Sequence, residues 1–119
     1  MFLNLSNHPS ESWDEKQKNE ARKYGDIVNM KFPEVLPYVS EEEIQKMADA
    51  VVSEVLRKKP EVVMCQGEFT LTYQIVKMLK SHNINVVSAC SERMSREEKM
   101  TDGSVEKTSI FHFVRFRSY

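Results

Sequence analysis

The spacing of hydrophobic residues predicts alternating strands and helices through the first third of the chain. Residues 1–6 form an apolar run, which is typical of a buried strand. Residues 13–24 are mostly charged, with Trp13 among the few apolar positions that share one face, so we expect a helix that covers one side of a sheet. Residues 26–30 predict a second strand. The prolines within residues 32–37 indicate a long connecting loop after it.

The next segments repeat the strand and helix alternation. Ser40 begins a capping-box pattern ahead of residues 44–56, where apolar positions recur at three- and four-residue steps and predict a long helix. Residues 61–65 predict a buried strand, residues 71–79 a third helix, and residues 84–90 a fourth strand. This order predicts parallel strands joined by helical crossovers.

The last segment has a different pattern. A polar stretch follows residue 91, Asp102 and Gly103 form a turn signal, and β-forming residues dominate from Ser104 to Arg117. We therefore expect a long hairpin over about 91–119. Together the elements predict an α/β fold: a three-layer Rossmann-like sandwich with right-handed crossovers, a mostly parallel sheet and an antiparallel C-terminal hairpin, in a single domain spanning 1–119.

Composition limits the possible function classes. The chain has 119 residues, 17 Lys and Arg against 18 Asp and Glu, and a formal charge of -1, so a broad basic surface for long DNA or RNA is not expected. No apolar run is long enough for a membrane span, and no signal peptide is recognisable, so we expect a cytoplasmic protein. Cys65 and Cys90 lack metal or redox spacing and should be reduced, and we expect no metal or other cofactor.

Ligands of such sheets bind outside the carboxyl ends of the strands, which directs attention to the loops there. The loops after the first, third and fourth predicted strands carry polar residues that should converge: Ser6, Asn7 and His8; Gln66, Gly67, Glu68 and Thr70; Ser91 and Arg93.

Several of these residues have a structural alternative. His8 is the best acid-base candidate, although a loop histidine can also be merely exposed. The helix that begins near Gly67 favours an anion, yet Glu68 or Thr70 could simply cap it. Arg93 is placed to bind phosphate. Arg115 and Arg117 are better explained as charges that protect a sheet edge.

Four short segments, residues 3–10, 67–70, 91–93 and 113–117, together resemble small stand-alone CRISPR-associated proteins. The resemblance spans nearly the whole chain. It implies a CARF-like Rossmann homodimer that binds cyclic oligoadenylate, with cyclic tetra-adenylate as the expected ring. Some such proteins are ring nucleases that linearise this second messenger and switch off the type III antiviral response.

Ring opening needs no metal if a ribose 2′-hydroxyl attacks the adjacent phosphate in line. The protein must then position the nucleotide, stabilise negative charge and move a proton. As catalytic candidates we expect His8, Asn7, Glu68 and Arg93; as ligand-binding residues we expect Ser6, Asn7, Gln66, Gly67, Thr70, Ser91 and Arg93. Adenines could stack on Trp13 or Phe69, unless these aromatic residues belong to the core.

Two other functions fit the same sequence. The protein could bind cyclic oligoadenylate as a non-catalytic sensor or sponge. It could also be a small protein-interaction subunit, whose loops bind protein and whose sheet is only a scaffold.

Overall fold

The computed structural model describes residues 1–119 and contains one five-stranded sheet. The strands are Phe2–Ser6 (β1), Ile27–Lys31 (β2), Val62–Cys65 (β3), Asn85–Lys99 (β4) and Val105–Ser118 (β5). The helices are Glu15–Arg22 (α1), Glu41–Lys58 (α2) and Phe69–Ser81 (α3), with a short 3-10 turn at Ser10–Ser12.

The strand order β2-β1-β3-β4-β5 is that of a doubly wound sheet. Strands β1 to β4 are parallel, and β5 runs antiparallel to β4. The predicted fold class, an α/β Rossmann-like sandwich with a mostly parallel sheet and an antiparallel C-terminal hairpin, is confirmed. The order reverses between β1 and β3, which is where ligands of such sheets usually bind.

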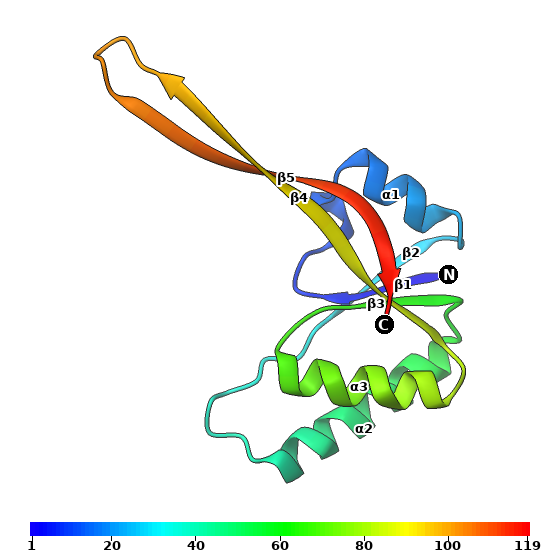
Figure 1. Ribbon diagram of the computed structural model, residues 1–119. Coiled ribbons are helices and arrows are strands. Elements are labelled where there is room, and N and C mark those ends of the chain that lie inside the picture. The colour runs from blue at the N-terminus through cyan, green and yellow to red at the C-terminus, as the bar shows by residue number, and fades with distance from the viewer.

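Helix α1 covers one face of the sheet, and α2 and α3 cover the other (Figure 1). The side chains of β1 point alternately to these two faces. Leu3 and Leu5 point into the larger core, which α2 and α3 close on one side of the sheet. Phe2 points to the opposite face, where it packs with Trp13 and Ala21 under α1. Strands buried on both faces need mostly apolar sequence, which explains the uninterrupted run in β3 and the run in β1 that only Asn4 interrupts before Ser6.

The N-terminal caps of α1 and α2 determine where these two helices begin. Ser40 caps α2 by accepting a hydrogen bond from the Glu43 backbone N–H at 3.2 Å, as predicted. The first helix is shorter than the predicted residues 13–24, because Asp14 caps it and the helix begins only at Glu15. Trp13 therefore lies outside the helix, in extended backbone, and its ring is buried in the core.

The boundary predicted between the fourth strand and the hairpin was wrong. Strand β4 does not end near Cys90 but continues as one strand to Lys99, and the hairpin consists of β4 and β5 themselves. No Gly or Pro interrupts the chain there until Gly103, so nothing stops the strand when it leaves the sheet. The only irregularity is Val114, an extra residue in β5 between the partners of Cys90 and Ser91.

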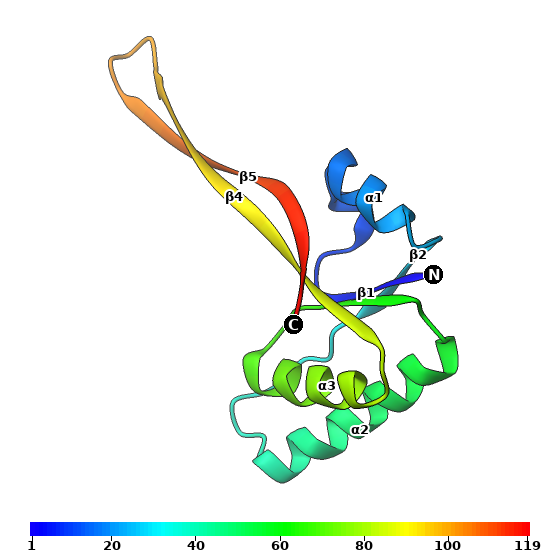
Figure 2. The same ribbon diagram turned by 45° about the vertical axis from the view of Figure 1, so that its right-hand side comes forward.

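The two strands leave the body of the protein as a twisted arm, which we define as residues 91–113 (Figure 2). The arm explains the elongated dimensions of the chain, 55 × 38 × 20 Å. None of the helices combines the length and the apolar character needed to cross a bilayer.

Both cysteines are free thiols. Cys65 is buried at the end of β3, and burial raises the pKa of its thiol to about 12, as expected for an inert apolar filler. Cys90 is only partly buried, because it stands where β4 leaves the sheet.

Candidate functional site

The largest hollow at the carboxyl ends of the strands lies on the face covered by α1. We call it the α1-side cavity, and it encloses about 710 Å³. It is lined by His8, Ser12, Trp13, Asp14, Gln17, Met64, Gln66, Ala89, Ser91, Phe111 and Phe113. The volume lies within the range of about 300–1,000 Å³ typical of small-molecule sites.

Three of the residues singled out in the sequence meet in this cavity. His8 comes from the loop after β1, Gln66 follows β3, and Ser91 stands on β4. These residues belong to three separate chain crossings. The register that pairs Leu5 with Cys65 places the first two loops next to each other at the rim of the sheet.

The position of His8 is determined through its main chain. Its carbonyl oxygen accepts hydrogen bonds from Asn4 Nδ2 at 2.8 Å and from Trp13 Nε1 at 3.1 Å. Its backbone N–H donates to Ser6 Oγ at 3.2 Å. The imidazole takes no part in these bonds and is exposed, so it is free to meet a ligand.

Asn4 organises this loop from below. It is 1% exposed although it lies in an apolar strand. Besides the bond to His8, its Oδ1 accepts from Ser6 Oγ at 2.6 Å and its Nδ2 donates to Asn29 Oδ1 at 2.9 Å. Asn4 was absent from the predicted site, but a lone amide in the middle of a buried strand was a visible signal, since such groups need partners.

Gln66 and Asp14 both supply polar groups to the lining of the α1-side cavity. Gln66 Oε1 accepts from the Ala89 backbone N–H at 2.8 Å, which leaves its Nε2 without a protein partner. The Asp14 carboxylate caps α1 and also accepts from the Phe113 backbone N–H at 3.2 Å. Asp14 thus joins the helix to β5, a role that the sequence pattern did not predict.

The turn between β3 and α3 is organised differently. Glu68 caps α3, because its carboxylate accepts from the backbone N–H groups of Thr70 at 3.0 Å and Leu71 at 2.8 Å. The Thr70 hydroxyl also donates to it, at 2.7 Å. Hydrogen bonds from Leu71 and Thr70 lower the pKa of Glu68. The capping alternative is confirmed, and the start of α3 already holds an anion of its own.

Gly67 has a packing role in this turn. A Cβ atom at Gly67 would collide with the ring of Phe32, which is buried beneath the turn. Glu68 and Thr70 line a separate cleft of about 520 Å³ between α3 and the loop before α2, together with Phe69. The structure therefore separates these residues from the α1-side cavity.

The remaining predicted residues lie outside the α1-side cavity. Ser6 and Asn7 line a smaller hollow of about 270 Å³ beside Asn29 and Lys31. Arg93 is on the arm, where its guanidinium donates to the Ser109 hydroxyl at 3.0 and 3.3 Å.

The aromatic residues near the strand ends lie in three different places: the core, the exposed start of α3 and the α1-side cavity. Trp13 belongs to the core, with its ring 6.1 Å edge-on from Phe2. Phe69 is 90% exposed at the start of α3. Phe111 and Phe113 line the α1-side cavity from β5, and neither was assigned to the site from the sequence.

Metal and charge complete the description of the site. No group of three or more His, Cys, Asp or Glu side chains is placed to hold a metal ion. No lysine or arginine lines the α1-side cavity. Its chemistry comes from one imidazole, amides, hydroxyls, one carboxylate and aromatic rings.

These features define an α/β protein of doubly wound order with a ligand-sized cavity at the carboxyl ends of its strands. The chain belongs to the family described as "Uncharacterized protein MJ1673 family", whose model matches residues 1–117 and so includes the arm. Searches of curated proteins and of solved structures give no match. The resemblance to CRISPR-associated proteins stays a prediction.

Proposed function

We propose that the chain binds a cyclic oligoadenylate, with cyclic tetra-adenylate as the expected ring, at the interface of a homodimer. We further propose that it opens the ring without a metal and so ends type III CRISPR signalling in the cytoplasm. The observation that carries this proposal is the meeting of His8, Gln66 and Ser91, from three chain crossings, in one cavity of ligand size.

The lining suits a nucleotide. The exposed ring of Phe111 offers aromatic surface on which an adenine can stack, and Phe113 is buried in the wall beside it. The free Nε2 of Gln66 and the hydroxyl of Ser91 can bond the base or the ribose. A two-fold symmetric ring presents identical halves, so two copies of this cavity would hold one ring.

The reaction is a transfer within the ring. The ribose 2′-oxygen bonds to the adjacent phosphorus, the bond from phosphorus to the 5′-oxygen breaks, and the products carry a 2′,3′-cyclic phosphate and a 5′-hydroxyl. The 2′-hydroxyl loses one proton and the departing 5′-oxygen gains one. The exposed imidazole of His8 is the cavity's candidate for accepting and returning that proton.

Phosphate charge needs a cation that the α1-side cavity itself lacks. Arg93 stands opposite Phe111 in the β4–β5 register, on the same face of the arm. Its guanidinium points outward to Ser109. A change of rotamer would turn it toward the cavity, where it could bond a phosphate.

A non-catalytic sensor or sponge is the second candidate, and one observation favours it. Glu68 is occupied as a helix cap and Arg93 is bonded on the arm, so of the four catalytic candidates only His8 lies in the cavity. A protein-interaction subunit would bind protein through its loops and would bind no nucleotide.

The decisive experiment is incubation of the full chain with cyclic tetra-adenylate in excess chelator, followed by chromatography of the products. Linear products that end in a 2′,3′-cyclic phosphate are expected. Binding without turnover would replace the enzyme with a sensor, and absence of binding would leave the interaction subunit.

Substitutions connect the activity to the cavity. His8→Ala should lower the cleavage rate about 10²- to 10⁴-fold, the usual contribution of a general acid-base group. His82→Ala is the matched control, because His82 is an exposed histidine at the far end of α3. Arg93→Ala should weaken ligand binding, and equal loss from His8→Ala and His82→Ala would remove His8 from the mechanism.

A further inference from the structure

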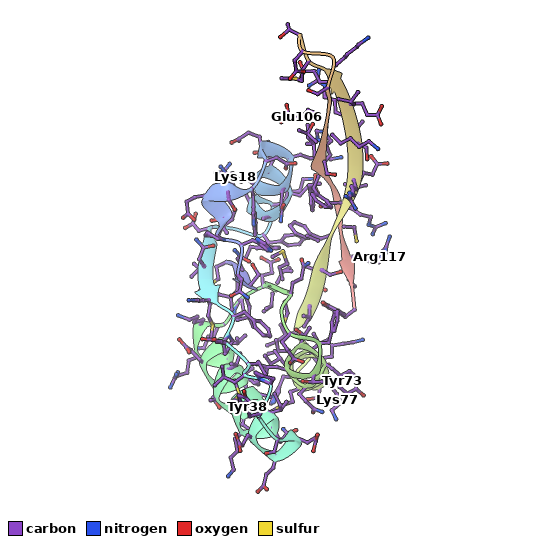
Figure 3. All side chains as sticks on the ribbon, turned by 90° about the vertical axis from the view of Figure 1, so that its left-hand side faces the viewer. Lys18, Tyr38, Tyr73, Lys77, Glu106 and Arg117 are labelled. Carbon is purple, nitrogen blue, oxygen red and sulfur yellow. The ribbon has the colours of Figure 1, made fainter.

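The arm is the least covered part of the molecule. From Ser91 to Lys99, β4 pairs only with β5, and every residue of that stretch is exposed (Figure 3, where Glu106 marks the arm). Only the base of the arm is covered, where α1 contacts β5 and Phe113 is buried. Isolated two-stranded ribbons are marginal in water, and free strand edges are templates for further pairing.

Apolar side chains make this exposure more costly. Met94 and Ile110 stand opposite each other on one face of the arm and are 54% and 42% exposed. On the other face Phe111 is 66% exposed and Val105 56%. Met94 and Ile110 form one exposed apolar pair, whereas Ser109 and Lys107 separate Phe111 from Val105 on the other face. Exposed apolar groups on an unsupported ribbon are suited to covering by a partner.

The outer edge of β4 has a regular set of unused backbone groups. The Ala89 backbone N–H points away from β5, since it bonds Gln66. Backbone groups alternate in direction along a strand, so Ser91, Arg93, Ser95 and Glu97 also direct their N–H and C=O groups outward. No hydrogen bond involves these outward groups, so this edge is open to another strand.

The charges of the arm indicate the kind of partner. Between Ser91 and Phe113 the arm has four cations and five anions: Arg93, Arg96, Lys99 and Lys107 against Glu92, Glu97, Glu98, Asp102 and Glu106. A nearly balanced mixture does not suit a polyanion such as nucleic acid. It suits a surface with the same mixture, which a second copy of this chain provides.

We propose that the outer edge of β4 pairs antiparallel with the same edge of a second copy, about a two-fold axis at Met94. This register places Ser91 opposite the partner's Glu97 and Arg93 opposite the partner's Ser95. Two symmetric ion pairs form between Glu92 and the partner's Arg96, and the Met94 side chains meet at the centre.

Charge selects this register over its neighbours. Opposite residues of an antiparallel pair have their side chains on the same face of the sheet. Residues on one face of β4 are an even number of positions apart, so the two-fold axis must pass through a residue and not between two residues. An axis at Ser95 would set Glu92 against the partner's Glu98. An axis at Arg96 would set Arg96 against itself and Arg93 against the partner's Lys99. Only the axis at Met94 avoids like charges while forming ion pairs.

The pairing has a consequence for the α1-side cavity. Ser91 lines that cavity, and its opposite residue would be the partner's Glu97. The partner's Lys99 would then lie beside Gln66 and bring a cation to a cavity whose own lining has none. This consequence rests on the proposed function, but the pairing itself does not. Its test uses no nucleotide: absence of cleavage leaves the pairing intact, a dimer with another register leaves the proposed function intact, and only a monomeric chain would contradict both.

A disulfide at the axis tests the register. In a Cys90→Ser background, Met94→Cys should give a covalent dimer under mild oxidation, because Cα atoms of such a pair stand about 4.5 Å apart. Glu98→Cys is the matched control on the same strand and face, and Glu98 takes part in neither proposed ion pair. Its Cα would be about 28 Å from its own copy, since each residue advances about 3.4 Å. Equal cross-linking of both variants would overturn the proposal.

A charge exchange tests the same pairing without cysteine. Glu92→Arg should weaken dimerisation about 2- to 30-fold in sedimentation experiments, because two ion pairs become repulsive. Adding Arg96→Glu should restore it. A wild-type chain that stays monomeric at high micromolar concentration would overturn the proposal, and so would a dimer indifferent to both changes.

Discussion

The loops after β1 and β3 lie side by side on one rim of the sheet but use their polar groups in opposite ways. In the first loop, buried side chains hold the main chain of His8 and leave the imidazole exposed. In the second, the Glu68 carboxylate is bonded to the helix it precedes. A polar side chain at a strand end is therefore available to a ligand only where the local backbone does not already use it.

The largest effect should come from the aromatic support of the first loop. Trp13→Ala should lower the free energy of unfolding by about 3–5 kcal/mol, because it removes a buried ring and the hydrogen bond to His8. Unfolding in urea followed by circular dichroism measures this, since Trp13 is the only tryptophan fluorophore.

Tyr38→Ala is the control for that change, because Tyr38 is a solvent-exposed aromatic residue of the loop before α2. Its removal should shift stability by less than about 0.5 kcal/mol. Similar losses in both variants would mean that Trp13 does not support the loop as described.

The next effect concerns packing beneath the second loop. Gly67→Ala should cost about 1–3 kcal/mol, because the added methyl group collides with the Phe32 ring. The same change in a Phe32→Leu background should cost less, since the collision is relieved. Denaturant titration of the four proteins gives the coupling, and strict additivity would contradict this explanation.

A smaller, pH-dependent effect should follow from the α3 cap. Glu68→Gln should destabilise the protein by about 0.5–2 kcal/mol at neutral pH. Because the pKa of Glu68 is lowered in the folded protein, the ionised form contributes stability that is present above its ordinary pKa. That stability is lost as the pH falls through the folded-state pKa.

The difference between wild type and Glu68→Gln should therefore shrink in acid, which thermal melts at neutral and acidic pH can measure. Glu34→Gln, in the exposed loop before α2, should change stability by less than about 0.5 kcal/mol. A difference that grows in acid would exclude the carboxylate as the cap.

The smallest effect on stability should come from the candidate catalytic group. His8→Ala should stay within about 0.5 kcal/mol of wild type, because the loop is held through the His8 main chain and not through its imidazole. Thermal melts check this. A large loss of stability would mean that the imidazole is structural, and the histidine would then no longer be free for a ligand.

The periodicity of the chain predicted most of the fold, and the reason is local. Apolar spacing specified the helix over Glu41–Lys58 together with its cap at Ser40, and mostly apolar runs specified β1 and β3. The same reasoning predicted the hairpin but ended the fourth strand at residue 90, because the apolar pattern stops there while the backbone pairing with β5 continues to Lys99.

The candidate site was less predictable. The sequence singled out His8, Gln66 and Ser91, and the structure places all three in one cavity. It did not show that Glu68 would be used as a cap, nor that Phe111 and Phe113 would return along β5 to line the same hollow. Those facts depend on partners distant in the chain.

The amino-acid sequence alone determined the number of layers, the parallel crossovers and the rim to which the polar loops point, because hydrophobic spacing and capping act over a few residues. Only the tertiary structure decided which of those polar groups remain free. That choice depends on hydrogen bonds and packing between residues far apart in the chain, such as Asn4 with Asn29 and Gln66 with Ala89.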